Sequence, residues 1–269
     1  MFKDLKSPII MGVVNVTPDS FSDGGRFDDV EKAVAHGLDL LGQGADILDI
    51  GGESTRPNAT PVSPDEEQSR ILPVIKGIKA VIPKALISVD TRNASTMQAV
   101  IECGADIIND ISALTHDAES LNVVAGAQIP VILMHMQGTP TTMQDNPKYE
   151  NIIQEICDYL DERIKLCESM GIARHMIAID PGIGFGKTLE DNLKMLNNID
   201  KFQSLGCAVL LGASRKSFIE KICPHTPADE RLAGSLAAAI KGLEAGVKIF
   251  RVHDVAQTKQ AFAVWQAMV

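Results

Sequence analysis

The sequence lacks the features of several large classes of binding protein. It has no excess of positive charge, because 25 Lys and Arg stand against 35 Asp and Glu, for a formal net charge of -10. An acidic chain repels nucleic-acid phosphates. No charge-free apolar run approaches the length of about 18 residues that a membrane span needs, and no apolar leader with a cleavage site precedes the first predicted strand. We therefore expect a cytoplasmic protein without a nucleic-acid partner or a membrane span.

Cysteine usage argues against a structural metal site or disulfides. The chain has five cysteines, an odd number, and no C-x-x-C pair. Most of them lie in apolar or helical contexts, so we expect buried, free thiols in a reducing compartment. The five positions are Cys103, Cys157, Cys167, Cys207 and Cys223.

Length and composition are those of an ordinary globular enzyme. The 269 residues are 45% hydrophobic and 22% charged, enough to bury a large core. Since α/β barrels of roughly 250 residues fold as one domain, we expect residues 1–269 to form a single domain.

Short apolar segments rich in Ile and Val alternate with amphipathic segments along the chain. This alternation is typical of a parallel sheet covered by helices. Helices are clearest at 31–44, 151–171 and 191–206. The predicted strands are 8–15, 45–50, 85–90, 105–109, 130–135, 176–180, 207–212 and 247–252.

A weak internal repeat supports a barrel. The segment Gly-Ala-Asp-Ile at 44–47 recurs at 104–107, and Gly-Val-Lys-Ile at 246–249 is similar. Each marks a helix ending at glycine, which suits the left-handed C-cap, before a strand. Eight such units predict a (β/α)₈ TIM barrel with its active site at the C-terminal ends of the strands. A doubly wound open sheet is the alternative, but no Gly-rich nucleotide turn follows the first strand.

Two predicted connections are too long for plain turns. Residues 17–29 and 54–67 are rich in Gly, Pro, Ser and Asp. In a barrel such βα loops emerge on the active-site face, where long loops are often functional lids.

Every predicted strand ends in residues that carry charge or form hydrogen bonds. Carboxylates and amides among them could bind the donor-rich edge of a flat heterocycle, and Phe185 could lie against its ring face. The basic residues could hold a polyanion, and Asn15 could also reach a divalent metal such as Mg²⁺, which binds phosphates through few protein ligands. The first group is Asp90, Asn109, Asp180 and Lys216, and the second is Asn15, Arg56, Arg215, Lys216, Arg251 and His253.

Five long motifs in order make the chain resemble the dihydropteroate synthases, a pterin-binding enzyme family. They are NVTPDSFSDGG (15–25), DIGGESTRP (49–57), DPGIGFGK (180–187), GASRKS (212–217) and RVHD (251–254). The resemblance implies a transferase of folate biosynthesis that joins 7,8-dihydropterin-6-ylmethyl diphosphate to p-aminobenzoate. It also implies that sulfonamides imitate the second substrate and that the enzyme is commonly a homodimer, for which residues 255–269 offer an apolar stripe.

The resemblance further implies where each substrate binds. The pterin would lie deep in the barrel and the diphosphate at its rim, with Mg²⁺ bound through Asn15. The pterin residues would be Asp90, Asn109, Met134, Asp180, Phe185 and Lys216. The diphosphate residues would be Asn15, Arg56, Arg251 and His253. The residues around p-aminobenzoate would be Thr55, Pro57, Phe185, Lys216 and Ser217.

The expected mechanism is electrostatic. Cations and Mg²⁺ would stabilise the departing diphosphate, so that departure precedes attack by the amine. Lys216, Asp90, Arg251 and His253 are the candidate catalytic residues. Three alternatives remain open: a methyltetrahydrofolate:corrinoid methyltransferase, a metal hydrolase, and a non-catalytic pterin-binding scaffold. The hydrolase lacks support because no H-x-H follows the first strand.

Some polar residues have a structural interpretation. Asp49 and Asp110 are expected to form structural hydrogen bonds, and His135 to be a buried structural histidine. Arg215 and Lys216 are adjacent, so one is expected to point outward into a salt bridge. Glu53 is left without a functional role.

Overall fold

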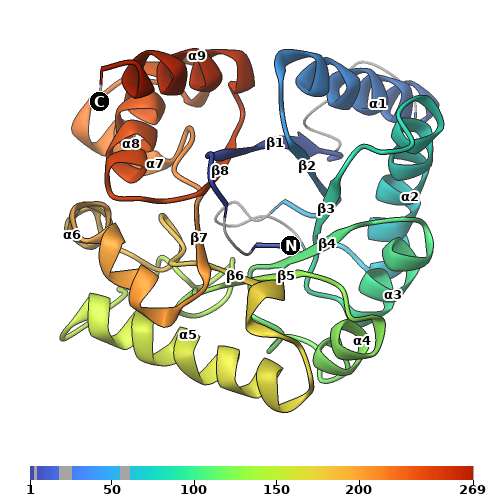
Figure 1. Cartoon of the computed structure of the whole chain (residues 1–269), viewed down its shortest axis with the longest axis horizontal. Coiled ribbons are helices and arrows are strands. Elements are labelled where there is room, and N and C mark those ends of the chain that lie inside the picture. The colour runs from blue at the N-terminus through green and yellow to red at the C-terminus, as the bar shows by residue number, and fades with distance from the viewer. Residues whose placement is uncertain (3–4, 18–25, 55–60, 269) are drawn as a thin grey trace.

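Eight parallel strands close into a barrel in sequence order, with β1 pairing to β8 (Figure 1). The computed structural model describes residues 1–2, 5–17, 26–54 and 61–268. The strands confirm all eight predicted segments and exclude the doubly wound open sheet. They are β1 (Ile9–Asn15), β2 (Ile47–Gly51), β3 (Ile87–Asp90), β4 (Ile107–Asp110), β5 (Val131–Met134), β6 (Ile177–Asp180), β7 (Ala208–Leu211) and β8 (Ile249–Val252).

Helices surround the barrel on the outside (Figure 1). The predicted helix at 191–206 is divided at Asn198 into α6 and a 3-10 helix over Ile199–Leu205. The α-helices of the described residues are α1 (Arg26–Gln43), α2 (Pro64–Val81), α3 (Ala94–Glu102), α4 (Ser120–Ala127), α5 (Ile152–Ser169), α6 (Leu189–Asn197), α7 (Ser217–Ile222), α8 (Leu232–Glu244) and α9 (Val255–Gln266).

The two long loops are shorter than predicted. Helix α1 begins at Arg26 and α2 at Pro64, so the predicted ranges 17–29 and 54–67 each include the start of a helix. The second start has a clear physical cause. The Ser63 hydroxyl accepts a hydrogen bond from the Glu66 backbone N–H at 3.3 Å, and Pro64 suits the first helical position.

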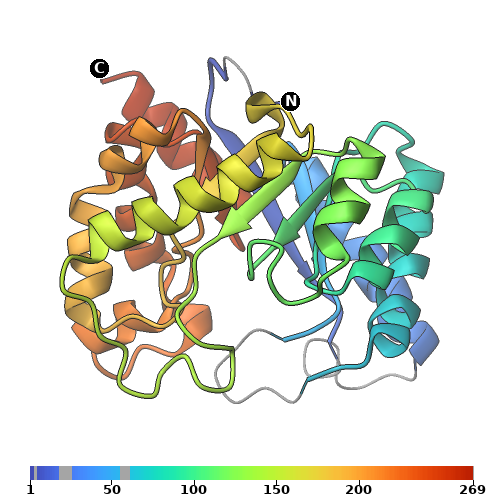
Figure 2. The ribbon, with the colours of Figure 1, turned by 90° about the horizontal axis from the view of Figure 1, so that it is seen from below.

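The barrel interior changes from apolar to polar along the strands. Side chains alternate between the two faces of a strand, and one inward layer is apolar apart from the buried Ser88 of β3. Its apolar residues are Met11, Ile47, Ile107, Ile132, Ala178, Leu210 and Ile249, with Phe2 packed beside them. The Phe2 backbone N–H donates to the His175 carbonyl at 2.9 Å. This apolar layer closes the end of the barrel at which the N-terminus lies, opposite the connection from β5 to α5 (Figure 2).

The main core lies between the sheet and the helices. Its strand residues are the neighbours of the inward ones, such as Leu48, Ile108 and Ile179, each fully buried. No helix among the described residues is long and apolar enough to cross a membrane.

The five cysteines are free. Cys167 and Cys207 are buried, but Cys223 is exposed, so the expectation of buried thiols is wrong for Cys223.

Candidate functional site

The layer above the apolar one carries the polar side chains. Two residues beyond Ile47, Ile107, Ala178 and Ile249 lie Asp49, Asn109, Asp180 and Arg251. Residues two apart on a strand face the same way, so these side chains point into the barrel. This register brings together groups from strands far apart in the sequence at the C-terminal end of the barrel.

Arg251 forms the centre of this layer. Its Nε donates to Asp49 Oδ2 at 2.6 Å and its Nη2 donates to Asp90 Oδ2 at 3.0 Å. The Asp49 side chain is fully buried, and Asn109 Nδ2 donates to its Oδ2 at 3.2 Å. Arg251 was expected among the cations at the rim, whereas its guanidinium donates to two carboxylates inside the barrel. Asp49 does form structural hydrogen bonds, as expected, but at the heart of the site.

Asp90 lies in an environment that disfavours the ionised form of its carboxyl group. Burial raises its pKa to about 7, with Arg251 opposing that shift and Asp49 adding to it. Its side chain is not a helix cap, because the N-cap residue of α3 is Asn93. A carboxylate with a raised pKa and a cation beside it is characteristic of functional sites.

Asp180 begins the loop that carries the DPGIGFGK motif. Its Oδ1 accepts a hydrogen bond from the Gly182 backbone N–H at 2.7 Å. Burial raises the pKa of Asp180, while the Gly182 N–H and Lys216 oppose the shift. Gly182 has φ +75°, and a Cβ there would collide with the His135 carbonyl oxygen. Glycine therefore lets the loop turn tightly against the segment that follows β5.

Lys216 points inward and Arg215 points outward, which confirms the expected division. The Lys216 ammonium lies 4.0 Å from the centre of the Phe185 ring, a cation–π geometry. Burial lowers the pKa of Lys216 to about 8, and Arg251 acts in the same direction. Arg215 instead pairs with Asp254, with Nη2 to Oδ1 at 2.5 Å.

Asp180 and Arg251 face each other across Gly212. A Cβ at Gly212 would lie 3.6 Å from Asp180 Oδ2 and 4.0 Å from Arg251 Cβ. The absence of a side chain leaves space between the acid and the base. We call Asp49, Asp90, Asn109, Asp180, Lys216 and Arg251 the barrel-mouth cluster.

His253 lies beyond the end of β8. Its Nδ1 lies 3.0 Å from the Ser214 hydroxyl oxygen. Burial lowers the pKa of His253 to about 3, and Arg251, Arg215 and Lys216 act in the same direction. His253 was expected among the cations, but its ring is neutral at neutral pH, so it can offer an anion an N–H donor and no positive charge.

The remaining predicted residues lie around the cluster or outside the described chain. Asn15 ends β1 and is half-buried, Ser217 begins α7 and is exposed, and Met134 ends β5. Met134 packs with Phe185, Ile111 and Met143. Thr55, Arg56 and Pro57 lie outside the described residues, as does most of the NVTPDSFSDGG motif.

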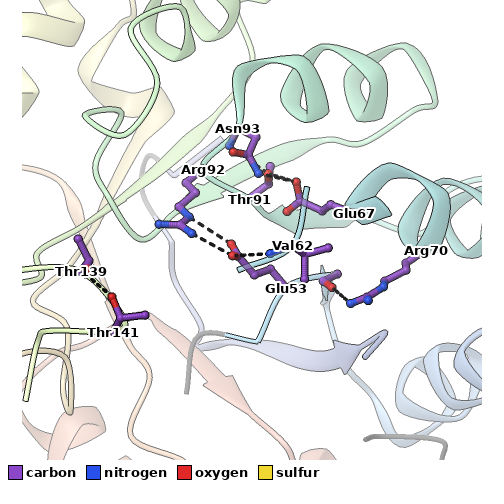
Figure 3. Close-up of polar contacts among 10 residues, drawn as sticks. Glu53, Val62, Glu67, Arg70, Thr91, Arg92, Asn93, Thr139 and Thr141 are labelled. Atoms are coloured by element: carbon purple, nitrogen blue, oxygen red, sulfur yellow. Dashed lines mark hydrogen bonds and ion pairs between the residues drawn. The ribbon is translucent and has the colours of Figure 1, made fainter. Parts of the chain in front are cut away.

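Glu53 and Arg92 form a polar clamp that the sequence did not reveal. Arg92 donates to both oxygens of Glu53, at 3.1 Å from Nε to Oε2 and 2.9 Å from Nη2 to Oε1 (Figure 3). The Glu53 carboxylate also accepts from the Val62 backbone N–H at 3.3 Å. Beside it, the buried Glu67 accepts from Thr91 and Asn93. The clamp thus joins three segments: the residues after β2, the residues after β3 and the residues just before α2. This gives Glu53 a structural role.

Two other structural interpretations are confirmed. The Asp110 carboxylate accepts backbone N–H bonds from Ser112 at 2.7 Å and Leu114 at 2.9 Å, which fixes the turn after β4. His135 is buried, and its Nδ1 lies 3.1 Å from the Lys187 ammonium. Lys187, a motif residue to which the sequence analysis gave no role, is itself 1% exposed.

The residues at the site suit Mg²⁺ only if the phosphates of a substrate supply most of its ligands. No group of three His, Cys, Asp or Glu among the described residues could hold a metal. Asn15 offers one amide oxygen at the end of β1. Mg²⁺ at phosphates usually keeps several waters and one or two protein ligands, so a single oxygen is compatible with it.

Comparison with known proteins agrees with this geometry. Residues 11–253 match the family described as pterin binding enzyme. The chain belongs to this family. It is 45% identical to a dihydropteroate synthase of Haemophilus influenzae over 98% of this chain and 95% of that protein.

Two solved dihydropteroate synthases of Xanthomonas albilineans share the fold. One contains 4-aminobenzoic acid and has a TM-score of 0.92 at 46% identity. The other contains 7,8-dihydropteroate and has a TM-score of 0.89 at 43% identity. Each comparison covers 98% of this chain and 94% of the other.

Proposed function

We propose that this chain catalyses the dihydropteroate synthase reaction, which condenses 7,8-dihydropterin-6-ylmethyl diphosphate with p-aminobenzoate and releases diphosphate. The observation that carries the proposal is the barrel-mouth cluster, in which polar side chains from five strands meet inside the barrel beside Lys216, which follows β7. Relatives that contain 4-aminobenzoic acid or 7,8-dihydropteroate at 43% identity or more support it.

The pterin ring suits the polar layer of the barrel. Its guanidine-like edge offers adjacent N–H donors, which a carboxylate accepts in pairs. Asp180 and Asp90 supply such carboxylates and Asn109 an amide, while Met134 and Phe185 supply apolar surface. Ligand hydrogen bonds would stabilise the ionised acids, whose burial is otherwise unfavourable.

The diphosphate lies toward the rim in this proposal. The C–O bond between the pterin methylene and the diphosphate breaks with its electron pair on oxygen. Arg251, Lys216 and the N–H donor of His253 stabilise that charge, and an approaching anion raises the pKa of His253 from about 3. Asn15 would hold Mg²⁺, which supplies Lewis-acid stabilisation to the leaving group when bound.

The second substrate binds at the mouth of the barrel. The p-aminobenzoate amine forms the new C–N bond to the methylene and loses one proton. This weak neutral nucleophile needs positioning more than activation. Phe185 is proposed to pack against its ring, and Lys216 to pair with its carboxylate. The Lys216 ammonium lies 4.0 Å from the centre of the Phe185 ring, and Ser217 follows Lys216 in the chain. Thr55 and Pro57 are the other residues proposed around p-aminobenzoate, whereas Arg56 is proposed to bind the diphosphate.

Departure of diphosphate before amine attack is the proposed order. Negative charge from Asp90 and Asp180 near the ring favours a cationic methylene. Scrambling of an oxygen label between the bridging and non-bridging positions of the pterin diphosphate, measured without the amine, is the expected result. A strict requirement for the amine before any scrambling would refute this order.

One assay tests the reaction itself. Protein, Mg²⁺, the pterin diphosphate and p-aminobenzoate are mixed, and diphosphate release and dihydropteroate are measured. We expect release that depends on the amine and is inhibited competitively by a sulfonamide. A corrinoid methyltransferase or a non-catalytic scaffold would release no diphosphate, and that result would refute the proposal.

A homodimer through α8 and α9 is also part of the proposal. A mostly apolar groove between these helices is lined by Leu232, Leu236, Ile240, Ala261, Val264, Trp265 and Met268, together with Gln257 and Gln260. Val264 is 56% and Met268 71% exposed, and such patches mark interfaces. Light scattering at micromolar concentration should give twice the chain mass, and Val264→Asp should lower it. A wild-type monomer would refute the dimer.

The proposed location is the cytoplasm. Free thiols such as the buried Cys167 and Cys207 and the exposed Cys223 suit a reducing compartment.

A further inference from the structure

Lys187 is a buried cation that the proposed mechanism does not use. Its side chain is 1% exposed, the lowest value of any basic residue among the described ones. A buried ammonium is costly unless its donors are satisfied. Lys187 Nζ has three acceptors: the Phe185 carbonyl oxygen at 2.8 Å, His135 Nδ1 at 3.1 Å and the His135 carbonyl oxygen at 3.3 Å. These match the three protons of an ammonium group.

His135 is suited to accept rather than donate. Burial, and then Lys187, lower the pKa of His135 to about 3, so the ring is neutral and accepts through Nδ1. The ring is held edge-on to Tyr159 at 5.0 Å between centroids. The partner of Lys187 is therefore fixed in place by packing.

The Lys187 contacts join two strand ends that shape the site. His135 follows β5, and its backbone N–H donates to the Asp180 carbonyl at 3.0 Å. Phe185, whose carbonyl Lys187 holds, presents its ring to Lys216. The loop between Asp180 and Lys187 is also tied from outside, because Tyr149 donates to the Gly186 carbonyl at 2.8 Å.

Lys187 also contributes charge. It is one of three cations that oppose the raised pKa of the Asp180 carboxyl, together with Lys216 and Arg251. Burial lowers the pKa of Lys187 itself to about 7, so the ammonium carries its charge at acidic pH and loses it as the pH rises above neutral. The charged groups facing Lys187 are Asp180, Asp191 and Lys216, in addition to the neutral His135. Lys187 therefore favours the ionised form of an acid that it does not touch.

We propose that Lys187 is a positioning residue for pterin binding, which holds the Asp180–Lys187 loop against His135 and thereby fixes Phe185 and the Asp180 carboxylate. The proposal rests on the pterin-binding role given above to Asp180 and Phe185. Lys187 acts through these two residues and contacts neither substrate.

The test compares neutral and charged replacements in the full chain. Lys187→Met removes the charge and keeps the length, Lys187→Gln keeps two donors without charge, and Lys187→Arg keeps the charge. Lys201→Met, at an exposed lysine, is the matched control. Thermal melting establishes that each variant is folded, and binding of 6-hydroxymethylpterin is measured by calorimetry from pH 5 to 9.

Both neutral variants should lose pterin affinity by about tenfold to a hundredfold, the loss that a misplaced site residue typically causes. The acid limb of pterin binding is the range in which affinity falls as the pH is lowered. In both neutral variants it should move to higher pH by about half a unit or more, because the Lys187 charge that favours ionised Asp180 is removed. Lys187→Arg should leave the limb in place even if affinity falls, and Lys201→Met should change neither. Lys187→Gln keeps the test valid if the Met variant does not fold.

Two results would overturn the proposal. One is a folded neutral variant that binds pterin within about twofold of wild type, a difference of about 0.4 kcal/mol. The other is an identical acid limb in the neutral and Arg variants, which would indicate a packing role alone. Absence of turnover in the wild-type chain would count against the proposed reaction only, since the pterin-binding comparison does not require turnover.

Discussion

Asp49→Asn should shift the pH dependence of pterin binding to lower pH. Asp49 is fully buried and shares the Arg251 guanidinium with Asp90. Its negative charge adds to the burial that raises the pKa of Asp90 to about 7. The variant removes that charge and leaves Asp90 as the carboxylate partner of Arg251. Both changes favour the ionised form of Asp90, so its pKa should fall.

The size of the shift follows from these contacts. A neighbouring charge moves a pKa by about one unit or more, and one unit corresponds to about 1.4 kcal/mol. If the pKa of Asp90 falls from about 7 to about 6, the ionised fraction at pH 6 rises about fivefold. Pterin affinity at pH 6, relative to the plateau at high pH, should rise by the same factor if ionised Asp90 binds the ring.

Pterin fluorescence or calorimetry between pH 5 and 9 measures this shift. The titration of the ligand itself is common to both proteins and cancels in the comparison. Asp200→Asn, at an exposed carboxylate, controls for loss of one negative charge far from the site. The plateau affinity is scored separately, because Asn at position 49 keeps one acceptor oxygen for Asn109 and Arg251 in place of two. An acid limb that stays in place or moves to higher pH would refute the account of the cluster.

Three further predictions concern residues around the cluster. Asp90→Asn should raise the melting temperature at pH 8 by about 2 °C or more, because a carboxyl whose pKa is raised to about 7 destabilises the fold above that pH. The gain should become small near pH 4, where Asp90 is protonated in the folded state and only partly ionised in the unfolded state, and a constant gain would contradict this. Arg92→Met should raise KM for p-aminobenzoate by about threefold or more, because Glu53 loses both hydrogen bonds to Arg92. Pterin affinity should stay the same, and equal losses for both substrates would count against this prediction. Gly212→Val should weaken pterin binding by about tenfold or more, since the valine side chain enters the space between Asp180 and Arg251. Gly42→Ala is the control, because a Cβ there meets nothing within 4 Å. Unchanged binding by the valine variant would place the pterin elsewhere.

The strands were predictable because local pattern determines them. Runs such as 177–179 are short, apolar and followed by a polar residue, here Asp180, which is the signature of a strand buried on both faces. The inward direction of Asp49 was also available in the sequence, since it lies two residues after Ile47 in the apolar layer. The start of α2 was available too, because a serine, a proline and three acidic residues at 63–67 form a standard helix N-terminus.

The pairing of charged groups was not available from the sequence. Arg251 meets Asp49 and Asp90 across separations of 202 and 161 residues. Those contacts depend on closure of the barrel between β8 and β1, which brings the last strand beside the first. Lys187 and His135, 52 residues apart, meet only because β5 and β6 are neighbours. Composition and periodicity specify which residues face inward, but closure specifies which of them touch.

The barrel-mouth cluster contains charges that the protein alone does not fully stabilise. Its acids are Asp49, Asp90 and Asp180, and its bases are Arg251 and Lys216. Burial raises the pKa of Asp90 to about 7 and lowers that of Lys216 to about 8, so each is held in an environment that disfavours its charged form. A fold selected only for stability would replace such groups with apolar ones of similar volume. A flat ligand with donors along one edge and an anion at its tail supplies the missing partners for both signs of charge. In the proposed function, a pterin diphosphate therefore gains affinity by pairing with charges whose burial is otherwise unfavourable.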